Sequence, residues 1–175
     1  LITHKGISGP AVLKLSAWQA RELADRRDEV GLTLNWTGGL TTGQVSERLR
    51  NLRREEGGKL VRKAPLFGLP RRLWERLCDQ ADIGPEVPRS RLSAEQERTL
   101  VDHLTAMPCG MKGKTLNKDE FVTCGGVELK EVDMKAFRSR LYPDLFFAGE
   151  VLDIDGVTGG FNFQNAWTGS FLAAS

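Results

Sequence analysis

Cysteine, histidine and long apolar runs are all scarce in this chain. Its 175 residues include three cysteines and two histidines. The cysteines, Cys78, Cys109 and Cys124, are odd in number and too widely spaced for a C-x-x-C pair. No apolar run reaches the roughly 18 residues that a membrane span needs, and no signal peptide is recognisable. We therefore expect no disulfide framework, no metal site, no membrane span and a cytoplasmic location.

Hydrophobic and charged residues are present in the proportions of a folded protein. The hydrophobic fraction of 40% is enough for a core in one or two domains. The net charge of +2 conceals a division along the chain. Residues 41–115 hold 15 Lys and Arg against 10 Asp and Glu, whereas residues 116–175 hold 5 against 9. The middle of the chain is basic and its end is acidic.

The basic middle has two interpretations. A basic segment is typical of proteins that bind nucleic acid. Here, however, Val45, Leu49 and Leu52 recur at helical spacing with arginines between them, as on an amphipathic helix whose charged face is solvated. We favour the solvated face and keep contact with RNA or phosphate as the alternative.

Periodicity and helix-breaking residues predict three helices in the middle of the chain. The first begins at Thr41 or Thr42 and ends near Glu55, the second begins at Leu69-Pro70, and the third begins at a capping box at Ser93. These helices predict a helical subdomain over residues 41–106. The flanking sequence is β-rich, with a helix beginning at Pro10 and strands expected at 30–36, 116–123, 129–132 and 145–148.

The end of the chain is its most informative part. After the strand at 145–148 comes an acidic, glycine-rich turn, and Thr158-Gly159-Gly160 then opens an apolar helix. Adjacent glycines let a ligand approach the main chain, and the free N–H groups of a helix start attract an anionic or polarised oxygen. A sharp loop without a ligand is the other interpretation. For Asp153 and Asp155 we favour backbone hydrogen bonding in the turn over acid–base chemistry.

Three blocks, in order along the chain, resemble one known family. Residues 149–162 resemble the pattern G-E-x-L-D-x-D-G-x-T-G-G-Y-N, with Phe161 where tyrosine is usual. Residues 3–10 resemble F-T-H-x-G-x-S-G-P, and residues 122–132 resemble V-T-x-G-G-V-x-x-x-E-V. The chain is thus similar to the HI0933-like or aminoacetone-oxidase-like NAD(P)/FAD-dependent oxidoreductases, which are bacterial flavoproteins.

The resemblance implies an α+β fold in three parts. Residues 1–40 and 107–141 would form an inserted β-rich, barrel-like domain on the substrate side, and residues 41–106 a small three-helix subdomain. Residues 142–175 would supply the last strand and helix of an FAD-binding Rossmann-like domain. The G-x-G-x-x-G fingerprint of such a domain does not occur in the sequence, and the chain begins at Leu1 without Met. We therefore expect the missing half of that domain, as a partner of this part, to lie upstream in a longer protein.

The resemblance also implies FAD as cofactor and a set of residues that hold it. Glu150 would bind ribityl hydroxyls, and the start of the last helix would stabilise negative charge at the pyrimidine edge of the flavin ring. No catalytic residue follows from the sequence, and the roles of His4 and Cys124 stay open. The implied cofactor-binding residues are Gly125, Gly126, Gly149, Glu150, Thr158, Gly159, Gly160, Phe161 and Asn162.

Two functions of different class follow from these observations. The first is the C-terminal portion of an FAD-dependent oxidoreductase that transfers hydride through flavin, with a small-molecule substrate and with NAD(P)H or oxygen as redox partner. The second is a non-catalytic interaction module whose basic helices bind RNA or a protein partner. We favour the first function, and with it we expect neither a membrane nor a nucleic acid as partner.

Overall fold

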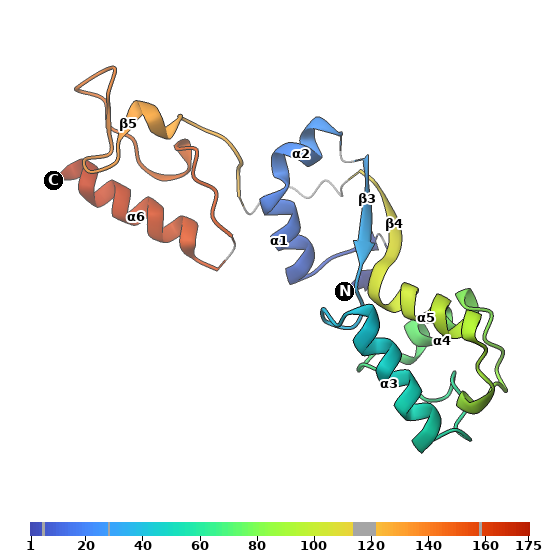
Figure 1. The fold of residues 1–175 in the computed structure, drawn as a ribbon. Helices are drawn as coiled ribbons and strands as arrows, with labels where there is room; N and C mark the ends of the chain where they lie inside the picture. Colours follow the sequence, from blue (N-terminus) through green and yellow to red (C-terminus); the bar gives the residue numbers. More distant parts are fainter. Residues whose placement is uncertain (5, 28, 114–121, 158) are drawn as a thin grey trace. The chain divides into compact units, whose positions relative to one another are not determined.

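The computed structural model describes residues 1–4, 6–27, 29–113, 122–157 and 159–175, which form two units. One unit combines Leu1–Val30 with Lys112–Ser175, and we call it the tail unit. The other, Gly31–Met111, is the helical unit. Figure 1 shows the elements of each unit.

Three helices form most of the helical unit, as the sequence predicts. They are α3 (Thr42–Glu55), α4 (Arg71–Gln80) and α5 (Ala94–Ala106), with a short 3₁₀ turn, η1, at Arg89–Arg91. Capping boxes start two of them, because the side chains of Thr41 and Ser93 each accept a hydrogen bond from the backbone three residues on. Strand β3 (Glu29–Leu34) confirms the strand predicted at 30–36. It pairs with β4 (Met107–Lys112), a strand that the sequence analysis did not predict.

The core of the helical unit lies between its three helices. Trp74 is 1% exposed, and its indole N–H donates to the carbonyl of Val61 at 2.8 Å, which satisfies the one polar atom of the buried ring. The apolar faces predicted for the helices are the faces that pack here, so the helix predictions are confirmed. The buried members of this core are Val45, Leu49, Val61, Trp74, Leu77, Cys78, Ala81, Ile83, Leu92, Leu100, Val101 and Leu104.

Two arginines of the helical unit are structural. Arg89 is 7% exposed and forms an ion pair with Glu56. Arg53 donates to the backbone carbonyls of Arg89 and Leu92 at 3.2 and 2.6 Å and pairs with Glu97 at 2.9 Å. These bonds fasten the segment before α5 to the end of α3, because they satisfy buried carbonyls and a buried guanidinium together.

The tail unit is built from shorter elements. Its described part contains an antiparallel pair, β1 (Ile2–Thr3) with β2 (Gly6–Ile7), and a second antiparallel pair, β5 (Val132–Asp133) with β6 (Arg138–Ser139). Its helices are α1 (Pro10–Trp18), α2 (Ala20–Asp25) and α6 (Phe161–Ala174), and its 3₁₀ turns are η2 (Leu129–Glu131) and η3 (Gly149–Val151). The helix expected from Pro10 is therefore interrupted, at Gln19.

A small core holds α6 against the strands of this unit. Val132, Phe137 and Leu152 are buried, and Leu172 packs against them. Gly169 of α6 faces the ring of Phe137 so closely that a Cβ atom would lie 2.7 Å from the ring. The opposite side of α6 is also apolar but exposed, since Phe163, Trp167 and Phe171 recur there at a spacing of four residues.

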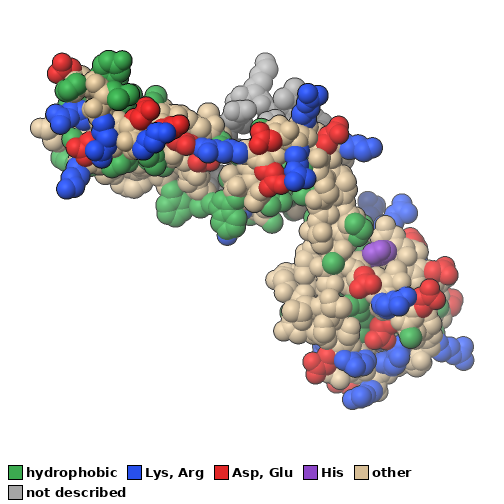
Figure 2. Space-filling view, turned by 45° about the horizontal axis from the view of Figure 1, so that its top comes forward, with side chains coloured by type: hydrophobic (Ala, Val, Ile, Leu, Met, Phe, Trp, Pro, Cys, Tyr) green, Lys and Arg blue, Asp and Glu red, His purple; other side chains and the backbone are tan. Residues whose placement is uncertain are grey.

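The α+β prediction is confirmed, whereas several predicted strands differ from the structure. Residues 145–148 make only an isolated bridge, between Phe146 and Arg138, and residues 129–131 form a 3₁₀ turn. Most of the strand predicted at 116–123 lies outside the described residues. The three-part domain division stays a prediction. No helix of the described residues is long and apolar enough to cross a membrane, and Figure 2 shows basic and acidic side chains interspersed on the face in view.

Candidate functional site

Two of the blocks singled out in the sequence lie side by side in the tail unit. The Val127 amide donates to the carbonyl of Val151 at 2.8 Å, and the Asp153 amide donates to the carbonyl of Val127 at 3.1 Å. These bonds make a parallel bridge between Val127 and Leu152. The block around Gly125-Gly126 is thereby fixed against the block that leads to α6, and we call this arrangement the glycine junction.

Gly126 is required by the junction itself. A Cβ atom on Gly126 would lie 2.5 Å from the carbonyl oxygen of Val151 and 2.8 Å from the amide nitrogen of Asp153, both of which are backbone atoms. Gly125, with φ of +105°, has nothing within 4 Å of its Cβ position. Close backbone packing therefore explains why residue 126 is glycine. The main chain at Gly125 is accessible to a ligand. Contact of either residue with a cofactor stays a prediction.

Asn162 fixes the turn that leads into α6. Its side-chain oxygen accepts a hydrogen bond from the Gly156 amide at 2.7 Å, and its side-chain nitrogen donates to the Gly156 carbonyl at 3.1 Å. An amide side chain that satisfies both backbone groups of one residue holds the turn in a single conformation. Thr158, which the sequence placed in the cofactor set, lies outside the described residues.

The start of α6 has an open and uncapped backbone. Gly159 and Gly160 have φ of +126° and +92°; among the described residues, nothing lies within 4 Å of the Gly160 Cβ position and no side chain caps the helix. Phe161 is exposed beside them. An uncapped helix start with exposed N–H groups suits an anionic or polarised oxygen. Gly149 and Glu150 lie in η3, with the Glu150 side chain exposed.

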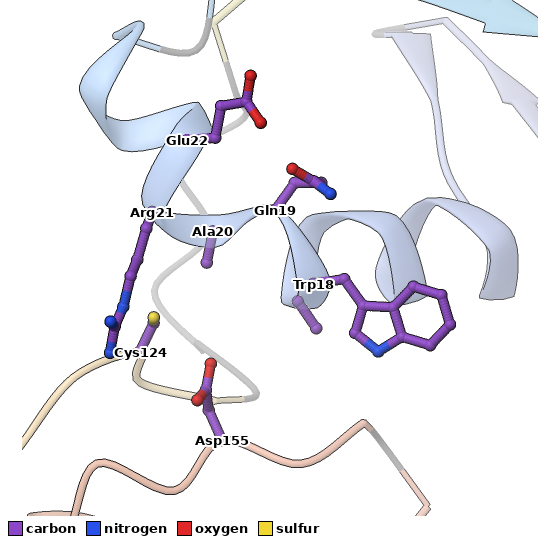
Figure 3. Close-up of a pocket in the computed structure, with 8 residues that line it drawn as sticks. Trp18, Gln19, Ala20, Arg21, Glu22, Cys124 and Asp155 are labelled. Atoms are coloured by element: carbon purple, nitrogen blue, oxygen red, sulfur yellow. The ribbon is translucent and has the colours of Figure 1, made fainter.

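A pocket of about 370 Å³ opens next to the glycine junction. The α1–α2 corner forms one side, and Cys124 and Asp155 form the other; Figure 3 shows the Arg21 side chain beside Cys124, with the Trp18 ring pointing away from both. The full lining is Ala17, Trp18, Gln19, Ala20, Arg21, Glu22, Cys124 and Asp155.

Arg21 is the charged centre of this pocket. Its guanidinium donates to both carboxylate oxygens of Asp153, at 2.6 and 2.7 Å. The Asp153 carboxylate, and after it Cys124, raises the pKa of Arg21 above its ordinary value. Asp153 thus pairs across the chain instead of serving the turn, contrary to our interpretation of the sequence. Periodicity within one segment carries no signal for a pair 132 residues apart.

The α1–α2 corner carries an exposed aromatic ring next to the pocket, on the side away from Arg21 and Cys124 (Figure 3). The Trp18 side chain is exposed at 64% of its surface although tryptophan is mostly buried in proteins, and the Lys14 ammonium lies 4.3 Å from its ring centroid. An exposed indole stacks on nucleobases and other planar rings, while Gln19 and Arg21 supply hydrogen-bond donors. Sequence reasoning missed this site because Trp18 fits the apolar stripe of a helix.

The remaining candidates are placed as follows. His4 is exposed next to β1. His103 lies on α5 in the helical unit, and its buried Nδ1 atom has no hydrogen-bond partner in the part of the chain that the structure describes. Within the described residues no three His, Cys, Asp or Glu side chains are grouped in a way that could hold a metal ion.

Comparison with known proteins gives two kinds of match. The family model described as "HI0933-like protein barrel and H2TH domain" matches residues 1–122. Two curated proteins called ribosomal RNA dihydrouridine synthase, from Escherichia coli and Haemophilus influenzae, are each 33% identical to the chain and cover 99% of it. The 3-dehydro-bile acid delta(4,6)-reductase of Clostridium scindens is 28% identical over 98% of the chain. The chain spans 41%, 41% and 42% of these three enzymes.

These matches correct two expectations. The interpretation as part of an FAD-dependent oxidoreductase that acts on a small molecule with NAD(P)H or oxygen is wrong in its substrate class, because two relatives that match nearly the whole chain are named for ribosomal RNA. The RNA-binding alternative fits them better. The expectation that nucleic acid is no partner is wrong for the same reason. A solvated helix face and contact with RNA do not exclude each other, because exposed arginines are available to water and to phosphate alike.

The resemblance read from the three sequence blocks is confirmed. The family model covers 122 of the 175 residues, including the first block at residues 3–10. The chain therefore belongs to the HI0933-like family.

Proposed function

We propose that this chain is part of an enzyme that forms dihydrouridine in ribosomal RNA. The observation that carries the proposal is the 33% identity to two ribosomal RNA dihydrouridine synthases, which extends over 99% of the chain. The match therefore includes the α1–α2 corner, the helical unit and the glycine junction together. A shared fold alone would leave the function open, but here the similarity runs through the candidate site.

The chemistry of the relatives supports a common reaction type. Dihydrouridine differs from uridine by two hydrogens across one ring double bond, and that bond is conjugated to a carbonyl. The name of the third relative, a delta(4,6)-reductase acting on a 3-dehydro compound, describes the reduction of double bonds near a carbonyl. Adding hydrogen to a conjugated double bond requires a hydride, a proton and stabilisation of negative charge on the carbonyl oxygen.

We assign the glycine junction to a flavin, and specifically to FAD. A flavin supplies the two-electron reduction when bound. The open backbone at Gly159 and Gly160, the uncapped start of α6 and the free main chain at Gly125 fit a flat, electron-rich ring. The residues that would hold the flavin are those that the family resemblance implies and the structure describes: Gly125, Gly126, Gly149, Glu150, Gly159, Gly160, Phe161 and Asn162. Their part is to place the ring and to favour negative charge at its edge.

We assign the pocket beside the junction to the uracil base. A base must leave the stack before an enzyme can act on its ring. The exposed Trp18 indole, which points away from Arg21 in the structure (Figure 3), would receive the base after a rotation of its side chain toward the pocket. Gln19 and Arg21 also line the pocket and can donate hydrogen bonds to carbonyl oxygens of the base. The carboxylate of Asp153 orients Arg21 for this task through two short hydrogen bonds.

Complementation tests the proposed function. The complete gene product that contains this chain is expressed in an Escherichia coli strain deleted for its ribosomal RNA dihydrouridine synthase. We expect dihydrouridine to return to the purified ribosomal RNA, as measured by mass spectrometry of its nucleosides. Normal expression of a folded product with no return of dihydrouridine would overturn the proposal.

A separate measurement tests the flavin site without relying on activity. Gly160→Val places a branched side chain where Gly160 has φ of +92°, and should lower the flavin-to-protein absorbance ratio of the purified gene product. Arg98→Ala, on the exposed face of α5, is the control and should leave that ratio unchanged. A folded Gly160→Val product with its full flavin content would remove the junction from the cofactor site.

The base assignment has its own test. Trp18→Ala should lower dihydrouridine formation by roughly 5- to 150-fold, because stacking on an aromatic side chain contributes roughly 1–3 kcal/mol per base. Trp18→Phe keeps a stacking ring and should retain most of the activity. Equal activity of Trp18→Ala and the unchanged protein would show that the uracil base does not stack on Trp18.

A further inference from the structure

The arginines of the helical unit fall into two groups. Those with an acidic partner are Arg53, Arg62, Arg71 and Arg89, paired with Glu97, Asp79, Glu75 and Glu56. Those exposed without an ion-pair or hydrogen-bond partner within the described part of the chain are Arg48, Arg50, Arg54, Arg72, Arg76, Arg91 and Arg98. Members of the second group are free to bind an external anion.

Two of these free arginines lie in a groove of the helical unit. The groove, of about 450 Å³, is lined by Arg72 and Arg76 of α4, by Arg62 from the preceding loop, and by Glu75 and Asp79. Both acidic side chains are already paired, Asp79 with Arg62 and Glu75 with Arg71. The two arginines that remain therefore face the groove with no counter-charge of their own.

This placement of charge disfavours folding of the helix. Arg72 and Arg76 are four residues apart on α4, where two like charges repel by about 0.2–0.5 kcal/mol. The first turn of α4 holds no acidic residue to offset the arginines there. A bound anion between the two guanidinium groups would turn this repulsion into attraction.

On the face that Figure 2 shows, the basic side chains do not form a broad positive field. Figure 2 shows acidic side chains among the basic ones on the face in view. Electrostatic binding of RNA therefore depends on places where several unpaired arginines line the same groove. Guanidinium groups bind phosphate in a planar, bidentate geometry, and they are common at RNA contacts for this reason.

We propose that the groove formed by Arg62, Arg72 and Arg76 binds the phosphate backbone of ribosomal RNA. The inference rests on the proposed function and adds the place of contact outside the site of chemistry. Phosphate contacts position a protein on nucleic acid without reading its sequence. The groove thus holds the RNA while the tail unit acts on one base.

Salt-dependent binding tests the groove. The 175-residue chain is titrated with deproteinised Escherichia coli ribosomal RNA, and the double variant R72Q/R76Q is compared with R91Q/R98Q, which removes two free arginines elsewhere on the same unit. Loss of two phosphate contacts should lower the slope of log affinity against log salt by about 1.4–1.8 and the affinity at 0.1 M salt by roughly 25- to 60-fold. The control should lose about 2-fold or less.

The outcomes separate this inference from others. Equal losses in the two double variants, or an unchanged slope in R72Q/R76Q, would overturn it. Polyglutamate serves as a second titrant that represents an acidic protein. If R72Q/R76Q lost affinity for polyglutamate but not for RNA, the groove would be assigned to an acidic protein and the inference would be overturned. Arg72→Lys and Arg76→Lys keep the charge and should recover part of the affinity if the glutamine variants fold poorly. If complementation succeeds but R72Q/R76Q binds RNA as well as R91Q/R98Q does, only the groove inference is refuted. If R72Q/R76Q loses RNA affinity selectively but complementation fails, only the proposed function is refuted.

Discussion

Gly126→Ala is the substitution that tests the glycine junction most sharply. The added Cβ would lie 2.5 Å from the Val151 carbonyl oxygen, 2.6 Å from the carbonyl carbon of Leu152 and 2.8 Å from the Asp153 amide nitrogen. All three are backbone atoms, so no side chain can rotate away. The two bridged segments must separate, and the hydrogen bonds that join Val127 to Val151 and Asp153 lengthen or break.

The size of the effect follows from three contributions. A non-glycine residue with positive φ costs about 1–2 kcal/mol, and overpacking costs about 1–3 kcal/mol. Two weakened backbone hydrogen bonds add about 1 kcal/mol each. Because separating the strands relieves the overpacking as it breaks the bonds, we expect a loss of about 3–5 kcal/mol in the local free energy of opening. Gly125→Ala, with open space at its Cβ position, should cost only the first contribution.

Amide hydrogen exchange measures this local stability. The amides of Val127 and Asp153 should exchange faster in Gly126→Ala than in Gly125→Ala by at least about 30-fold, since each 1.4 kcal/mol corresponds to a factor of ten. Amides of the α3–α5 core, in the other unit, serve as the internal control. Identical exchange in the two variants would refute the close packing on which the junction depends.

Three further results are expected. Gly169→Ala should destabilise the docking of α6 by about 1–2 kcal/mol in urea unfolding, because the clash at 2.7 Å with the Phe137 ring exceeds the gain in helix propensity; a more stable variant would contradict this packing. Alkylation at pH 8 should modify Cys78 last of the three cysteines by mass spectrometry, because burial raises the pKa of its thiol to about 12. Hydrogen bonds from Lys59 and then Arg89 hold the pKa of Glu56 below its ordinary value. The ionised carboxylate therefore stabilises the chain above about pH 4.3, and this contribution is lost as pH falls below that value. Glu56→Gln should remove it in urea unfolding at a series of pH values; the same pH dependence in both proteins would show that these contacts do not contribute to stability.

The helical unit was predictable because its signals are local. Capping residues such as Thr41 and Ser93 and the apolar spacing of Val45, Leu49 and Leu52 act within one helix. The start of α6 at Gly160 followed in the same way, from glycines before an apolar run. The strand predicted at 145–148 failed because its apolar residues are mostly exposed in the tail unit and make only one bridge.

The candidate site was only partly predictable because it is assembled from distant segments. The family blocks marked both sides of the glycine junction, and the structure brings them together at Val127 and Leu152. The pocket depends on the pair between Arg21 and Asp153 and on a helix break that exposes Trp18. Neither feature has a periodic signal. The partner was misjudged because an amphipathic helix leaves its exposed arginines free for solvent or for RNA, and periodicity does not distinguish the two.

Formation of dihydrouridine by the purified protein is the most direct test of the proposed function. The complete gene product, loaded with flavin and a reductant, is incubated with ribosomal RNA from an Escherichia coli strain that lacks its own ribosomal RNA dihydrouridine synthase. Mass spectrometry of the digested RNA should then detect dihydrouridine, in an amount that rises with enzyme and is lower for the Trp18→Ala variant at the same enzyme concentration. Unmodified RNA in the presence of folded, flavin-loaded protein that reduces a small conjugated ketone would contradict the account.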